Sequence, residues 1–128
     1  MKFERTYSGS PWEPKVGYCR ALRAGQLIFV TGTAPVAVGG GVHAPGDAAA
    51  QTRRCFEIIE QALRELGADL SCVVRTRMFV TDISRWQEYG SVHGELFGAS
   101  PPTTTMVEVR ALIDPQMLIE IEADAVAP

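Results

Sequence analysis

The strictest pattern in the chain is an alternation of side chains in residues 117–126. Small or apolar residues occupy every second position, and larger or acidic residues fill the positions between them: Met117, Ile119, Ile121, Ala123 and Ala125 against Leu118, Glu120, Glu122 and Asp124. Because successive side chains of a strand point to opposite faces of a sheet, this segment predicts a strand with one buried and one polar face. Other elements of the chain must therefore cover one side of it.

Several other segments have the composition of strands. Apolar and β-branched runs predict strands at residues 17–23, 26–31, 72–81 and 103–110, and an additional edge strand at 3–8. Ala24-Gly25 lies between two of these runs and indicates a tight hairpin turn. Residues 35–46, which include three consecutive glycines, are interpreted as a long loop, because no phosphate-binding glycine pattern continues from them.

Two segments have helical spacing instead. Asp47 is a suitable N-cap for a helix that Gly67 ends, with Cys55, Ile59 and Leu63 on its buried face. A second helix over residues 85–97 carries apolar residues and a histidine at helical spacing: Trp86, Tyr89, Val92, His93 and Leu96. The element order predicts an α+β fold in one domain, residues 1–128, with a mixed six-stranded sheet and both helices on one face.

The sheet face opposite the helices should carry both charges and aromatics. Period-two spacing assigns to it Arg77 and Phe79 from one strand and Glu120 and Glu122 from another. Such a surface is too apolar for plain exposure and too charged for the core of a monomer. We therefore expect it to be buried against other copies of the chain.

Composition narrows the classes of partner. The net charge is −3 with 21% charged residues, so no basic surface for nucleic acid is expected. No apolar run approaches the roughly 18 to 20 residues that span a membrane, and the polar N-terminus lacks the apolar segment of a signal peptide, so we expect a cytoplasmic protein. Three widely spaced cysteines and two histidines 50 positions apart predict neither a disulfide framework nor a metal site.

Two C-terminal segments and three earlier ones carry a family resemblance. Residues 102–109 (Pro-Thr-Thr-Thr-Met-Val-Glu-Val) and 119–123 (Ile-Glu-Ile-Glu-Ala) resemble the C-terminal signature of the RidA/YjgF family. Gly17-Tyr18, the strand ending in Thr31-Gly32-Thr33, and the segment 74–82 follow the family order over residues 16–126. The resemblance implies a chorismate-mutase-like fold, a homotrimer, and ligand pockets between subunits.

The resemblance also implies a chemistry. Active members hydrolyse reactive enamines and imines to keto acids and ammonia without a metal or organic cofactor, and some eukaryotic members are described as ribonucleases. In active deaminases an arginine two residues after the proline grips the substrate carboxylate, and here that position is Thr104. Loss of a charge-assisted pair in an enclosed site costs about 2 to 5 kcal/mol, so the grip on a carboxylate is expected to change.

Other positions match the family's pocket residue by residue. Tyr18 corresponds to its tyrosine and Glu120 to its strand carboxylate, both expected to be catalytic, and Gly32 and Met106 match positions whose backbone faces the ligand. The expected ligand-binding set is completed by Thr33, His93, Thr104 and Arg20. Arg20 lies two residues after Tyr18, which puts both on one face of an extended segment and makes it the candidate replacement anchor for an anion. An ordinary salt bridge to a glutamate is the alternative for this arginine.

Three functions remain open at this point. The first is hydrolysis of an enamine, imine or related metabolite in a pocket between subunits. The second is a non-catalytic module that binds a small anionic metabolite in the same pocket. The third and weakest is an endoribonuclease, which the acidic composition does not favour.

Overall fold

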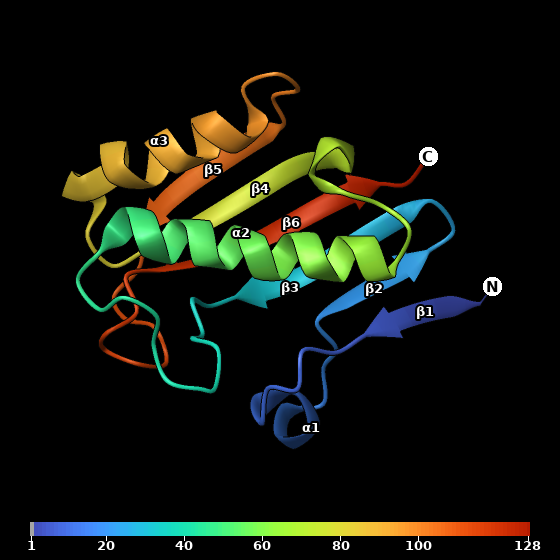
Figure 1. Ribbon diagram of the computed structural model, residues 1–128, viewed down its shortest axis with the longest axis horizontal. Coiled ribbons are helices and arrows are strands. Elements are labelled where there is room, and N and C mark those ends of the chain that lie inside the picture. Colours follow the sequence, from blue (N-terminus) through green and yellow to red (C-terminus); the bar gives the residue numbers. More distant parts are fainter. Residues whose placement is uncertain (1) are drawn as a thin grey trace.

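The computed structural model describes residues 2–128 and contains one six-stranded sheet (Figure 1). The strands are β1 (Phe3–Thr6), β2 (Ala21–Ala24), β3 (Leu27–Thr33), β4 (Val73–Val80), β5 (Thr103–Glu108) and β6 (Ile119–Val126). Their order in space is β1-β2-β3-β6-β4-β5, and only β4 and β5 run parallel. The predicted mixed sheet is confirmed, and the alternating segment forms one of its central strands.

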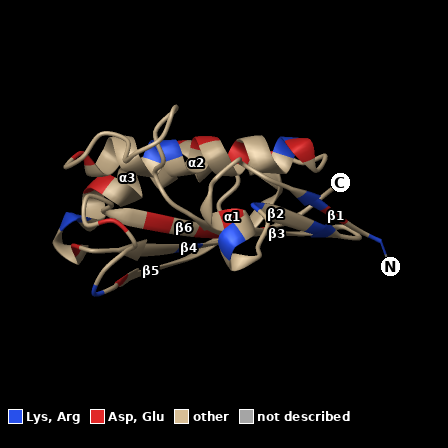
Figure 2. Cartoon of the chain, turned by 90° about the horizontal axis from the view of Figure 1, so that it is seen from below, with Lys and Arg blue, Asp and Glu red and all other residues tan. Residues whose placement is uncertain are grey.

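Two long helices cover one face of this sheet (Figures 1 and 2). Helix α2 (Ala48–Glu65) begins at Asp47, whose side chain accepts a hydrogen bond from the Ala50 N–H at 2.9 Å. Helix α3 (Trp86–Phe97) lies beside it and follows a short 3₁₀ turn at Ile83–Arg85. Ile119 and Ile121 of β6 are fully buried beneath the helices, so the alternation in the sequence does mark the core face.

Two local features differ from the sequence prediction. The strand expected at 17–23 is reduced to β2, because a short helix, α1 (Trp12–Val16), precedes it. This helix ends at Gly17, whose φ of 89° lies in the left-handed region that glycine adopts most easily. A register shift between Val73 and Arg75 interrupts the regular alternation expected of the strand at 72–81, so that Val73 is buried in the core and Val74 is 46% exposed.

The face of the sheet away from the helices is uncovered in a single chain (Figure 2). Arg77 lies opposite Glu122 and Phe79 opposite Glu120 in the β4–β6 register, which confirms that these side chains share that face. Arg77 is 3.6 Å from Glu122 and 3.4 Å from Asp124. Large apolar side chains stand exposed among these charges: Leu27, Phe29, Val107 and Val126.

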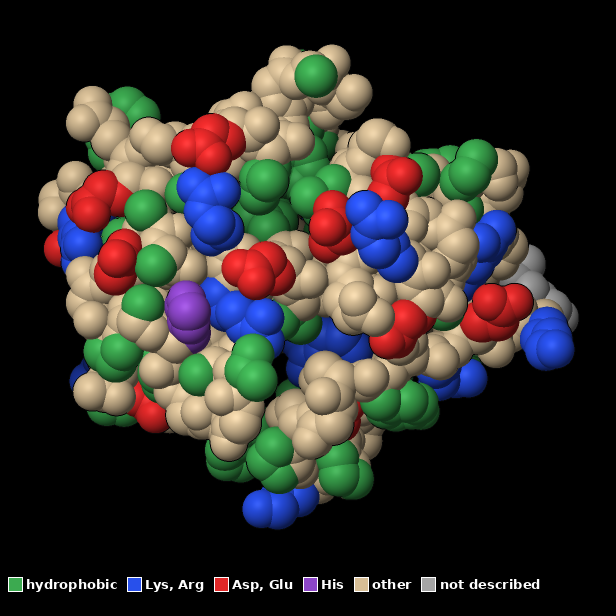
Figure 3. Space-filling model, viewed as in Figure 1, with side chains coloured by type: hydrophobic (Ala, Val, Ile, Leu, Met, Phe, Trp, Pro, Cys, Tyr) green, Lys and Arg blue, Asp and Glu red, His purple; other side chains and the backbone are tan. Residues whose placement is uncertain are grey.

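The helix-bearing face has a different character. Acidic and basic side chains are interspersed over it, without a continuous basic strip (Figure 3). Within residues 2–128, no helix combines the length and apolar character that crossing a membrane requires.

Candidate functional site

A carboxylate and a glycine from neighbouring strands form the first part of the candidate site. Gly32 lies at an irregularity of β3, where the register with β6 shifts between Val30 and Thr33. The Glu120 side chain occupies the space beside it, since a methyl group added to Gly32 would lie 2.8 Å from Glu120 Oε2. A residue without a side chain at position 32 therefore lets the Glu120 carboxylate lie close against the backbone of β3.

Glu120 is half-buried and has no hydrogen bond or ion pair to any other described residue. Burial raises the pKa of its carboxyl group, and the charge of Glu122 on the same strand raises it further. The Arg20 guanidinium opposes this shift without cancelling it. A partly shielded carboxyl group with a raised pKa and no partner is suited to accept and return a proton.

Arg20 is held inside the chain by a buried ion pair. Its Nε and Nη2 donate to Glu13 Oε2 at 3.2 and 3.1 Å, and its Nη1 donates to the Gly32 carbonyl at 3.0 Å and to Thr33 Oγ1 at 3.3 Å. The guanidinium carbon also lies 5.6 Å from the centroid of the Tyr18 ring. These contacts use four of the five N–H groups of the guanidinium, so the alternative of an ion pair with a glutamate is the arrangement that the structure shows.

Glu13 is the residue that the sequence prediction missed. Its side chain is 2% exposed, and it accepts hydrogen bonds from the backbone and hydroxyl of Ser8 as well as from Arg20. Burial alone would raise the pKa of Glu13, but the bonds from Ser8 and Arg20 outweigh it and hold the pKa below its usual value. The available signal was Ser10-Pro11 three residues ahead of Glu13, a typical start for a helix, with Gly17 at its end.

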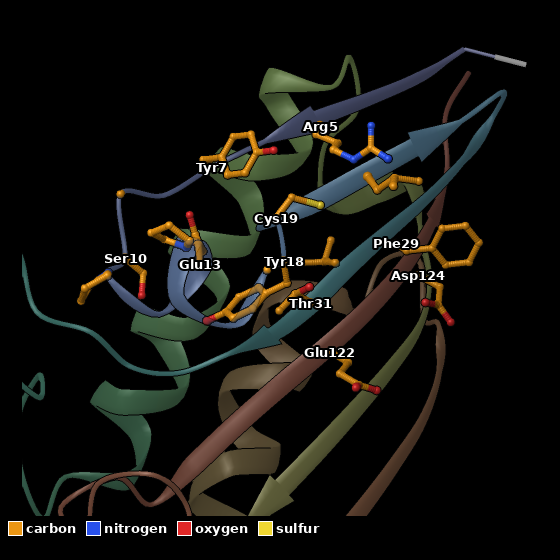
Figure 4. A pocket seen from close by; sticks show the side chains of 16 residues that line it. Arg5, Tyr7, Ser10, Glu13, Tyr18, Cys19, Phe29, Thr31, Glu122 and Asp124 are labelled. Carbon is orange, nitrogen blue, oxygen red and sulfur yellow. The ribbon is translucent and has the colours of Figure 1, made fainter.

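Tyr18 lies in a groove on the face away from the two long helices. The groove has a volume of about 1020 Å³ and runs between α1 and strands β3 and β6. Tyr18 and Glu13 line its α1 side, and Glu122 and Asp124 line its β6 side (Figure 4). Thr33, in contrast, is 1% exposed and donates its hydroxyl to the Thr31 carbonyl at 2.7 Å, so its side chain is part of the support beneath Arg20.

A second group of predicted residues lies under helix α3. His93 Nε2 is 2.8 Å from Thr76 Oγ1, and Thr76 Oγ1 is 2.7 Å from Thr104 Oγ1. Thr76 is fully buried in β4, whereas Thr104 is exposed on the edge strand β5. The His93 ring packs against Phe97 at 4.7 Å and Phe56 at 5.8 Å between centroids, and burial lowers its pKa.

The predicted site residues thus fall into two groups within one chain. Glu120 alternates with buried Ile119 and Ile121 and points to the open face of the sheet. Thr104 and Met106 pair with Thr76 and Met78, whose side chains are buried on the helix face. Strand β4 separates β6 from β5, so a single chain does not bring the two groups into one pocket.

Cys55 does not add a nucleophile to either group. Cys55 is fully buried in α2, and burial raises the pKa of its thiol well above the ordinary range, with a further contribution from Glu120. Across residues 2–128, no three His, Cys, Asp or Glu side chains come together in a group that could hold a metal ion.

The sequence matches one known protein family over nearly its whole length. Residues 9–127 match the family described as Endoribonuclease L-PSP, which is almost the whole chain. The chain belongs to this family. The expected RidA/YjgF resemblance is thereby confirmed at the level of the family.

Solved structures of the Endoribonuclease L-PSP family and related proteins share the fold. The crystal structure of Rv2704 from Mycobacterium tuberculosis, a member of the YjgF/YER057c/UK114 family, is 50% identical. It superposes with a TM-score of 0.90 and covers 98% of this chain and 100% of its own. This agreement confirms the α+β fold that the element order predicts.

Two curated relatives match nearly the whole chain. An uncharacterized protein of Streptomyces coelicolor is 35% identical over 121 residues, covering 94% of this chain and 90% of its own length. The 3-aminoacrylate deaminase RutC of Acinetobacter baylyi is 33% identical over 117 residues, covering 91% of both chains.

Proposed function

We propose that this chain is a homotrimeric hydrolase that converts small enamines or imines to carbonyl compounds and ammonia. The observation that carries the proposal is the Glu120 carboxylate, half-buried against Gly32, unpaired within the described chain, and raised in pKa. The name of the Acinetobacter baylyi relative, a 3-aminoacrylate deaminase, supports the same class of reaction.

The proposed reaction requires one proton acceptor. An enamine first tautomerises to the imine as a proton moves from nitrogen to carbon. Water then adds to the carbon of the protonated C=N bond while the Glu120 carboxylate takes one of its protons, which gives a carbinolamine. Glu120 returns that proton to the nitrogen, the C–N bond breaks, and ammonia leaves as the hydroxyl group releases its proton to solvent and becomes the carbonyl. One carboxyl group with a raised pKa can therefore serve both steps.

The division of site residues between two faces supports the trimer. Glu120 and Gly32 lie on one part of the sheet, and Thr104 and His93 lie beyond β4 on the other face. Contact between the open sheet face of one copy and the β5 edge of another would combine the two groups in one pocket. The same contact would cover apolar side chains that are about half exposed in one chain, such as Leu27 at 49% and Phe29 at 48%.

The test of this function is a direct assay with two substrates. We expect the protein to accelerate ammonia release from 3-aminoacrylate or from 2-aminoacrylate generated in situ, measured against buffer and against heat-denatured protein. Failure to accelerate either reaction would remove hydrolysis of these simple enamines from consideration.

Non-catalytic binding of a small metabolite is the second candidate. Arg20 is already paired with Glu13, and Thr104 carries no charge, so the chain has a weaker grip on a carboxylate than an unpaired arginine would provide. Ligand-dependent thermal stabilisation without turnover of any enamine would favour this candidate over the hydrolase.

Gly32→Ala tests the role of the space beside Glu120. The new methyl group would lie 2.8 Å from Glu120 Oε2, and the end of that side chain must move away. Since a flexible side chain can move at small cost, we expect the unfolding free energy to change by less than about 1 kcal/mol. Turnover should fall by about tenfold or more, because a displacement near 1 Å can cost about a hundredfold. Unchanged turnover would show that the position of this carboxylate does not matter.

A further inference from the structure

Three polar groups form a continuous chain from the protein surface into the interior beneath α3. Thr104 Oγ1 stands exposed on β5, Thr76 Oγ1 is buried behind it at 2.7 Å, and Nε2 of the half-buried His93 lies 2.8 Å from Thr76 Oγ1. No Lys or Arg side chain donates a hydrogen bond to any of the three in residues 2–128. Arg53 and Glu95, which join α2 to α3, pair with each other at 2.9 Å.

This chain of hydrogen bonds can run in either of two directions. A threonine hydroxyl carries one hydrogen and also accepts, and a neutral imidazole has one donor and one acceptor nitrogen. If His93 Nε2–H donates to Thr76, then Thr76 donates to Thr104, and the Thr104 hydrogen points outward. If Thr104 donates inward, Thr76 donates to His93 Nε2, and Thr104 offers only its lone pairs to a ligand.

We infer that Thr104, backed by Thr76 and His93, binds an uncharged nitrogen or oxygen of the substrate, so that the preferred substrates carry an amide or other neutral polar group rather than a carboxylate. This inference rests on the proposed function, because it names the substrate class of the same intersubunit site. Thr104 contacts the ligand in this account, and Thr76 and His93 are positioning residues.

The two possible directions of the Thr104–Thr76–His93 hydrogen-bond chain fit the proposed chemistry. An enamine nitrogen donates through its N–H, whereas an imine nitrogen or a carbonyl oxygen accepts. The Thr104 hydroxyl can accept a hydrogen bond from the enamine or donate one to the imine or carbonyl. The change needs only rotation of two hydroxyl hydrogens and a change of the His93 tautomer, without any change in net charge. A carboxylate at the same point would meet no positive charge, since burial beside Phe56 and Phe97 favours the neutral form of His93.

The test compares pyruvate with pyruvamide, the carboxylate and the uncharged amide of one keto compound. Binding is followed through the His93 ring signals by NMR, with His43, the other histidine of the chain, as an internal reference. We expect pyruvamide to move the His93 signals and to bind about fivefold or more tightly than pyruvate. Thr104→Arg should reverse this preference, because a guanidinium grips a carboxylate through two hydrogen bonds.

Variants of the buried groups separate this role from a structural one. Thr76→Val keeps the shape of the side chain and should lower the affinity for pyruvamide by about tenfold, while the affinity for pyruvate changes less. His93→Phe preserves the aromatic packing and should have the same effect if Thr76→Val does not fold. Ser91→Ala is the matched control, because the Ser91 hydroxyl on the same helix bonds, among residues 2–128, only to the Gln87 carbonyl, at 2.7 Å.

The outcomes distinguish this inference from the proposed hydrolase. Tighter binding of pyruvate by the unmodified protein, or an unaltered amide preference in both Thr76→Val and His93→Phe, would overturn the inference. If the protein nevertheless hydrolyses 2-aminoacrylate, the proposed hydrolase function is retained and only the inference about the substrate class fails. Preference for pyruvamide together with no turnover of any enamine would support the inference and overturn the hydrolase.

Discussion

Glu120→Gln is expected to reduce enamine or imine hydrolysis by about 10²- to 10⁴-fold, the usual contribution of a positioned proton acceptor. Glutamine has nearly the same shape but cannot accept a proton, so ligand binding should be retained. The measurement is the initial rate of ammonia release by purified variant and unmodified protein at saturating substrate. A loss smaller than about threefold would assign the proton transfer to another group.

The same substitution has an opposite effect on stability, and its sign follows from the pKa. Burial raises the pKa of Glu120 in the folded chain, so folding favours the protonated form. The stabilisation that the protonated Glu120 gives to the folded chain is fully present below the pKa of a glutamate in the unfolded chain, near 4.3. It is lost as pH rises through the raised pKa of the folded chain. Glu120→Gln avoids this loss, so the variant should gain thermal stability relative to the unmodified protein at pH 7 and little at pH 4.

Glu13→Gln is expected to destabilise the fold by about 3 to 5 kcal/mol, because it leaves a buried guanidinium without its counter-charge. Arg20 and Glu13 side chains are only 7% and 2% exposed, and the pair ties α1 to the end of β3 through Gly32 and Thr33. Denaturant unfolding at fixed protein concentration measures the change, as a lower midpoint with an unchanged slope.

A surface pair provides the matched control. Arg54 and Glu57 lie 3.6 Å apart on α2, with the Glu57 side chain 57% exposed. Glu57→Gln should cost less than about 1 kcal/mol, because water screens exposed pairs. Equal effects of Glu13→Gln and Glu57→Gln would mean that the Arg20 pair does not hold the N-terminal segment in place. The pKa of Glu13 is lowered, so its stabilisation should be present near neutrality and lost as pH falls through the folded value.

The periodic elements were predictable from the sequence for a physical reason. The alternation in β6 and the i, i+3, i+4 spacing in α2 each repeat over several residues, so one burial pattern fits them. Helix α1 has only five residues, and Pro14 lies inside it, so no period could be recognised. The bulge that exposes Val74 depends on pairing with β6, which local spacing does not contain.

The candidate site was predictable in its residues but not in their connections. Tyr18 and Arg20 do lie close together, with 5.6 Å between the guanidinium carbon and the ring centroid, but both precede β2, so the strand alternation used to pair them is not what positions them. Glu13, the partner of Arg20, could not be identified, because their meeting depends on the unpredicted helix α1. Thr76 was not recognised as part of the site, because its link to His93 and Thr104 requires the packing of α3 and the parallel register of β5.

The proposed site exists only if further copies of the chain cover the open sheet face, and sedimentation velocity of the unmodified protein tests this most directly. Across micromolar concentrations we predict one species with a mass close to three times the 13.9 kDa of the chain. A single species of 13.9 kDa over the same range would contradict the intersubunit site, because Glu120 and Thr104 would then stay on opposite faces of one sheet.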